Sequence, residues 1–147
     1  MLNSIFESST IPLLQQAAAF AERRHAVLAG NIANISTPDY KTRDLPVAEF
    51  QKALQEAVGR RRIAQLPAGA NWSFTSPVAS GEREQFPKEL MRAAEGPPRT
   101  LTFQDGNNRS VESEALEMTK NSLLQNVAIE LMMAQMNRLQ AVISERP

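Results

Sequence analysis

Few residues in this sequence could carry acid–base, nucleophilic or metal chemistry. His25 is the single histidine and cysteine is absent, so thiol chemistry and any metal site built from several histidines or cysteines are excluded. To act as a general base, His25 would need a nucleophile or an orienting carboxylate beside it, whereas its sequence neighbours are Arg23 and Arg24. We therefore expect no enzyme and no catalytic, cofactor-binding or metal-binding residue; a small hydrolase is the third-ranked alternative.

Two short segments could bind ligands, but their context argues against it. The arginines at 60–62 could contact phosphate, yet 16 basic and 16 acidic residues cancel to zero net charge, and no aromatic residues alternate with these arginines. Residues 105–108 begin like a calcium-binding loop, but the ligand series does not continue to a glutamate at the loop's end. The sequence thus predicts no nucleic-acid partner and no small-molecule substrate.

The 147 residues fit one domain, and no targeting or membrane segment stands out. There is no run of about 18 apolar residues, so a membrane-spanning helix is not expected. The N-terminal residues lack a basic region followed by an apolar core and a cleavage site, so a cleaved signal peptide is not expected either. Taken alone, these features predict a cytoplasmic protein.

The N-terminal region, residues 1–59, is predicted to be helical. Thr10 is a candidate N-cap, and Pro12 lies where the first helical turn tolerates proline. Apolar residues then recur at three- and four-residue spacing, with His25 as the only polar member of the stripe. The stripe consists of Leu14, Ala18, Ala21, Leu28, Ile32 and Ile35. The helix should end at residues 36–38, because a residue that precedes proline is displaced from helical angles.

A second, shorter helix is expected after Pro46, and the chain changes character beyond it. Its apolar positions are Val47, Phe50, Leu54 and Val58. The middle segment, residues 60–104, is rich in proline and has no apolar period, so we expect extended chain or a small β-containing module. A short helix near 88–94 and strand pairing between 72–75 and 100–103 are possible within it.

The C-terminal region, residues 105–147, is predicted to form one long helix over about 110–145. Ser110 could cap it, and Glu112 and Glu114 would favour the positive end of the helix dipole. The expected fold is therefore mainly α, with long N- and C-terminal helices that pack in a coiled-coil-like manner and form one domain.

This C-terminal helix is too apolar for a single neighbour. With a turn of 100° per residue, its apolar positions cover about half of the circumference, whereas a surface helix needs a stripe of about 100°. These positions are Leu124, Val127, Ala128, Leu131, Met132, Met136, Leu139, Val142 and Ile143. Met133 lies opposite Leu124, on the side that a partner helix would leave uncovered. Either a larger core or other chains must cover this surface, and the shortage of further helical sequence favours other chains.

One segment, residues 28–41, carries a distinctive resemblance. It contains Asn-Ile-Ala-Asn at 31–34, followed by Thr37-Pro38-Asp39-Tyr40-Lys41. The segment resembles the N-terminal signature of the flagellar rod, hook and hook-associated family, and residues 105–124 are similar to the C-terminal signature of a short rod member. The family usually has glycine where Asp39 stands, but aspartate tolerates left-handed backbone angles comparatively well. An aromatic residue that is usual near Gln125 is missing.

The two asparagines of the signature also have a physical role without the family. Asn31 and Asn34 lie three residues apart, and each amide can donate and accept hydrogen bonds. They are predicted to pair across a helix interface or to cap carbonyls at the helix end.

The resemblance implies an assembly rather than a catalyst. Terminal helices of many subunits would pack as a tube around an axial channel, and the subunit would reach the periplasmic rod through the type III export apparatus without a cleaved signal. The implied partners are copies of itself, other rod proteins, the rod-to-membrane-ring adaptor and the export apparatus. The predicted subunit contacts are Leu28, Asn31, Ile32, Asn34, Tyr40, Leu124, Val127, Leu131, Met132, Met133, Met136 and Leu139. The second-ranked alternative is a soluble coiled-coil interaction module, such as an export chaperone or regulator.

Overall fold

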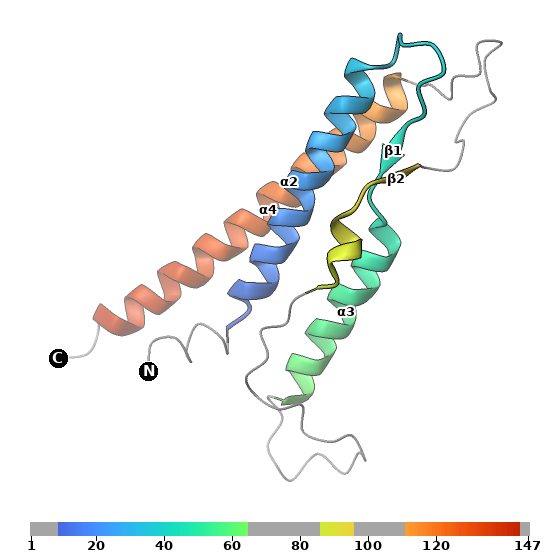
Figure 1. The fold of residues 1–147 in the computed structure, drawn as a ribbon. Helices are drawn as coiled ribbons and strands as arrows, with labels where there is room; N and C mark the ends of the chain where they lie inside the picture. The colour runs from blue at the N-terminus through green and yellow to red at the C-terminus, as the bar shows by residue number, and fades with distance from the viewer. Residues whose placement is uncertain (1–8, 65–85, 96–110, 145–147) are drawn as a thin grey trace, which may run out of the picture.

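The computed structural model describes residues 9–64, 86–95 and 111–144, and it is mainly helical (Figure 1). The elements are α2 (Ile11–Ala33), β1 (Arg43–Asp44), α3 (Val47–Ala64), a 3-10 turn η1 (Lys88–Met91), β2 (Ala94–Glu95) and α4 (Val111–Ser144). The long helices α2 and α4 lie side by side, and α3 lies on another side of α2 (Figure 1). The predicted fold class is confirmed.

The start of α2 agrees with the sequence in position but not in its hydrogen bonding. Thr10 occupies the N-cap position and Pro12 lies in the first turn, as predicted. The Thr10 side chain makes no capping hydrogen bond, however, because its backbone is already near helical angles. The Ser9 hydroxyl accepts a bond of 3.3 Å from the Ile11 amide instead.

The end of α2 is set by Asn34 rather than by the proline. The helix stops at Ala33, ahead of the predicted end at 36–38, and the Asn34 side-chain amide donates a bond of 2.8 Å to the Gly30 carbonyl. Asn34 therefore caps the helix end, as the sequence predicts. In the following turn, Asp39 has a φ of 57°, in the left-handed region where the family usually has glycine.

An aromatic core joins α2 to α3. The Phe20 and Phe50 rings stack with centroids 3.8 Å apart, and Phe86 meets the edge of Phe50 at 5.2 Å. Leu45 completes the buried cluster. The helix after Pro46 is confirmed, but its predicted apolar position Val58 is exposed.

A short strand from the middle of the chain pairs with a strand of the first half. β2 pairs antiparallel with β1, so that Arg43 lies opposite Glu95 and Asp44 lies opposite Ala94. The short helix expected near 88–94 is present as the 3-10 turn η1. The strands expected at 72–75 and 100–103 lie outside the described residues. The helix α3 continues past the expected division at residue 59, as far as Ala64. The division of the chain into three regions stays a prediction.

The helix α4 is the longest element. It spans 34 residues, about 50 Å at 1.5 Å per residue, and it runs antiparallel to α2. Figure 1 shows that its C-terminal part extends past the start of α2. Only Asn121 and Ala128 are fully buried along its length, so α4 meets α2 through a narrow row of side chains.

Candidate functional site: the α2–α4 interface

The face of α2 that meets α4 is built from alternating apolar and polar residues. Ala21, Arg24, Leu28 and Asn31 follow one another at three- and four-residue spacing, and all are buried. The prediction that His25 is the polar member of this stripe is wrong. Ala21 and Leu28 of the predicted stripe are buried, but Arg24 takes the place of His25, because its aliphatic stem can line the interface while its guanidinium reaches a partner. His25 is half-buried, and its Nδ1 atom has no hydrogen-bond partner.

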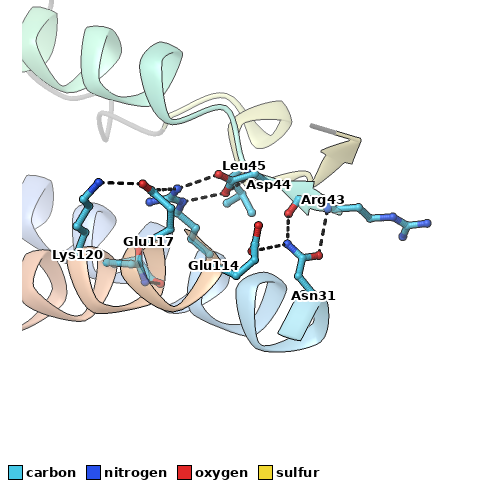
Figure 2. A network of polar contacts seen from close by, with 10 residues as sticks. Asn31, Arg43, Asp44, Leu45, Glu114, Glu117 and Lys120 are labelled. Atoms are coloured by element: carbon cyan, nitrogen blue, oxygen red, sulfur yellow. Dashed lines mark hydrogen bonds and ion pairs between the residues drawn. The ribbon is translucent and has the colours of Figure 1, made fainter. Parts of the chain in front are cut away.

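Asn31 is the centre of the polar contacts at one end of this interface (Figure 2). Its Nδ2 donates 2.7 Å to the Arg43 carbonyl and 3.0 Å to a Glu114 carboxylate oxygen. Its Oδ1 accepts from the Arg43 amide at 3.0 Å and from the Tyr40 hydroxyl at 3.1 Å. The side chain is 1% exposed, and all four of its hydrogen-bonding positions are used. One amide thus joins α2, the turn after it and α4.

Arg24 makes the second connection, through ionic bonds. Its Nε and one Nη donate to the two Asp44 carboxylate oxygens, each at 2.8 Å, and the same Nη donates 2.9 Å to Glu117. The Arg24 side chain is 5% exposed. A planar guanidinium fits this fork of carboxylate oxygens better than an ammonium does. Asp44 also accepts a bond of 2.8 Å from the Leu45 amide, which holds the carboxylate in place.

The charges in this group shift one another's pKa values. The hydrogen bonds that Arg24 donates to Asp44 and Glu117 raise its pKa above the ordinary value, although burial acts in the opposite direction. The hydrogen bond from Arg24 lowers the pKa of Glu117, and Lys120, 3.0 Å away, adds to the shift. Glu117 is therefore held as a carboxylate, and the buried guanidinium stays paired.

Asn121 supplies a third connection from α4. Its Nδ2 donates 2.7 Å to the Ala21 carbonyl within α2, and Asn121 is 1% exposed. Asn31, Arg24 and Asn121 thus hold the two long helices in one antiparallel register. We call these three residues with Asp44, Glu114 and Glu117 the polar network.

The structure separates the predicted contact residues into two groups. Leu28 and Asn31 are buried inside the chain, whereas Ile32, Asn34 and Tyr40 are half-buried beside them. Met132 and Leu139 are half-buried. The exposed members are Leu124, Val127, Leu131, Met133 and Met136. Those buried inside the chain hold it together, and the exposed ones remain available for contacts with other chains.

The apolar surface of α4 lies on both sides of the row that faces α2. Turning 100° per residue places Asn121 and Ala128 at the centre of that row, rather than Leu124. One flank consists of Leu116, Leu123, Leu124, Val127, Leu131 and Val142, and the other of Ile129, Met133, Met136 and Ile143. Leu124 is 57% exposed and Met133 54%. Packing on α2 therefore leaves most of the predicted apolar surface uncovered.

Four residues with no role predicted from their spacing make the main polar contacts between the helices. Arg24, Asp44, Glu117 and Asn121 form the ion pairs and the helix–helix bond described above. Arg24 has the helical spacing of this face, since it lies three residues after Ala21, four before Leu28 and seven before Asn31. Its partners Asp44 and Glu117 are 20 and 93 residues away, so no helical spacing relates them to Arg24.

The described parts of the chain also contain no group of three acidic or histidine side chains that could hold a metal ion. In the same residues, no helix is long and apolar enough to cross a membrane.

Comparison with known proteins identifies the class. No known family model matches the chain. The flagellar basal body rod protein FlgB of Bacillus subtilis is 28% identical over 93% of this chain and 95% of its own length. FlgB of Aeromonas hydrophila is 30% identical, with 85% of each chain covered, and FlgB of Escherichia coli K12 is 26% identical, with 88% of each covered.

The paired terminal helices and these relatives define a structural subunit of the flagellar basal body rod. Within that class, the chain belongs to the family of the flagellar basal body rod protein FlgB. The resemblance seen in residues 28–41 is confirmed, and the relatives favour a rod subunit over an export chaperone.

Proposed function

We propose that the chain is a non-catalytic subunit of the proximal rod, and that the two apolar flanks of α4 bind neighbouring rod subunits. The observation that carries this proposal is their position on either side of an interface whose own polar groups are satisfied. Because the polar network already fixes α2 against α4, the flanks are free to bind other chains without changing the fold of the subunit. Large exposed apolar patches of this kind mark interaction sites.

The chemistry of the flanks suits contacts with several different neighbours. Met133 and Met136 have flexible thioethers that adapt to differently shaped surfaces. Leu124, Val127 and Leu131 supply a flatter aliphatic surface on the other flank. A subunit with apolar surface on two sides of one helix can contact two neighbours at once, and non-closing contacts of this kind generate a helical tube.

The finer parts of the proposal follow from the family. The partners are copies of this chain, other rod proteins and the rod-to-membrane-ring adaptor, in a tube that transmits torque and encloses an export channel. The chain reaches its periplasmic place through the type III export apparatus without a cleaved signal. Residues 1–59 and 105–147 form the rod core, and residues 60–104 form a separate middle segment.

Met133→Glu tests the role of the flanks. Met133 is exposed in the isolated chain, so the free energy of unfolding should change by no more than about 0.5 kcal/mol. In a rod, the new carboxylate would be buried without a partner, which costs several kcal/mol at every repeated interface. The variant should therefore be produced and exported normally but be absent from purified basal bodies.

Met133→Leu is the matched control, because it keeps an apolar side chain of similar size and should support motility. A motile Met133→Glu strain with normal basal bodies would show that this flank is not buried in the rod.

A further inference from the structure

An apolar groove lies at the end of the molecule where α2 begins. Its volume is 260 Å³, and all three long helices contribute to its walls. The lining residues are Thr10, Leu13, Leu14, Ala17, Leu54, Val58, Leu131 and Gln135. An apolar cavity of about 150 Å³ is enough to bind benzene, so this groove can accept an aromatic side chain.

The last turns of α4 adjoin the groove. Beyond Gln135, which lines it, the helix continues to Ser144. Leu139 continues the row of Asn121 and Ala128 at helical spacing, and Val142 lies at the end of the flank that contains Leu131. Leu139 is half-buried, and Val142 is exposed. These two apolar positions follow the groove residues Leu131 and Gln135 at helical spacing.

The sequence just before α2 has a matching pattern. Leu2, Ile5 and Phe6 are spaced by three and four residues, which is the spacing of one helix face. A straight backward continuation of α2 would instead point Glu7 and Asn3 at α4. The described chain has a bend at Ser9 and Thr10, just before α2.

The attachment point of this segment lies at the rim of the groove. The Ser9 carbonyl accepts a hydrogen bond from Arg61 of α3, and Thr10 is itself a wall of the groove. Phe6 is only a few residues from Ser9, within reach of about 10 Å of extended chain. A short tether of this kind gives an effective concentration on the order of millimolar, which favours the chain's own segment over that of a second copy.

We propose that residues 2–6 of the same chain dock on this surface, with the Phe6 ring in the groove and Leu2 against Leu139 and Val142. The docked segment lengthens the α2–α4 pair and covers the end of the flank that contains Leu131. The flank that contains Met133 stays exposed for neighbours. Docking is a property of the isolated chain, so it can be tested independently of rod assembly.

Cysteine pairs provide the test, since the chain has no cysteine of its own. Ile5→Cys is combined with Val58→Cys at the groove, or with Val111→Cys at the far end of α4. The test position Val58 and the control position Val111 are matched in exposure, at 50% and 51%. Under mild oxidation of the monomer, the first pair should form an intrachain disulfide at least about tenfold faster than the second. Equal rates, or a disulfide-linked dimer as the main product, would overturn the proposal.

A second measurement avoids any effect of the introduced thiols. Phe6→Ser should raise hydrogen exchange at the backbone amides of 136–144 by at least about tenfold, because the docked segment no longer protects them. Amides at 114–121 lie next to the polar network and should be unchanged. Equal exchange at 136–144 in both proteins would show that residues 2–6 do not dock there.

Discussion

The two sides of α2 pack through different kinds of interaction, apolar on one side and polar on the other. Toward α3, the Phe20 and Phe50 rings stack in an apolar core, which tolerates small changes of shape. Toward α4, Arg24, Asn31 and Asn121 make directed bonds that allow only one register. The apolar core supplies stability that is not directional, whereas the polar network specifies which residues of the two chain ends meet. A rod subunit needs the second property, because its outer flanks must be presented at fixed positions.

Arg24→Met should have the largest effect on this arrangement. Removing the guanidinium leaves Asp44 and Glu117 close together without their cation, and breaking a buried ion pair costs about 3–5 kcal/mol. Urea unfolding followed by circular dichroism would measure the loss. Arg23→Met, at the exposed neighbouring position, should change stability by no more than about 0.5 kcal/mol. Equal effects of the two variants would mean that the ion pairs do not stabilise the fold.

Asn31→Asp should come next. A carboxylate cannot donate to the Arg43 carbonyl or to Glu114, and it adds a negative charge beside Glu114. Leaving buried groups unsatisfied costs about 1–3 kcal/mol. Asn34→Asp is the control, since Asn34 caps only the Gly30 carbonyl and should cost about 0.3–1 kcal/mol at a helix C-terminus. If Asn34→Asp proves the more damaging of the two, the interface role of Asn31 is wrong.

Phe50→Leu should cost less, because leucine refills most of the apolar volume and loses mainly the ring stacking, about 0.5–1.5 kcal/mol. This loss should be independent of salt between low and high ionic strength, as expected for apolar packing. Chemical denaturation with urea at both ionic strengths checks it. A strongly salt-dependent loss would remove the distinction between the two sides of α2.

The smallest expected effect is that of Glu117→Gln on stability at acidic pH. The pKa of Glu117 is lowered in the folded chain, so this carboxylate contributes stability that is fully present above its ordinary, unfolded pKa. That contribution is lost as the pH falls below this value toward the folded pKa. Glu117→Gln should therefore flatten the acid side of the stability curve, whereas exposed Glu130→Gln should leave it unchanged. If the free energy of unfolding of Glu117→Gln fell with acid as steeply as that of the unchanged chain, the pairing of Glu117 with Arg24 would be contradicted.

The sequence was informative where the signal is local. Helix periodicity and proline positions located α2 and α4, and the amide chemistry of Asn31 and Asn34 predicted either contacts across a helix interface or caps at the helix end. Asn31 makes a contact across the interface, and Asn34 caps the helix end. The left-handed angle of Asp39 also follows from a local turn pattern.

What could not be predicted depends on distant partners. Periodicity shows which side of α4 is apolar, but it does not show which neighbour covers that side. The apolar side counted from Leu124 did not reveal that α2 packs on the row of Asn121 and Ala128. In the same way, Arg24 looks like an exposed charge until Asp44 and Glu117 are brought to it by the fold.

The spacing of the polar network along the chain also sets the order in which it can form. Arg24 and Asp44 are 20 residues apart, whereas the bonds from Arg24 to Glu117 and from Asn121 to Ala21 close loops of 93 and 100 residues. Loop closure becomes more costly with length, and long-range contacts slow folding. The first half of the chain can therefore pair Arg24 with Asp44 early. The Arg24 guanidinium is then already oriented when α4 packs against α2. The C-terminal helix therefore determines when the polar network is complete.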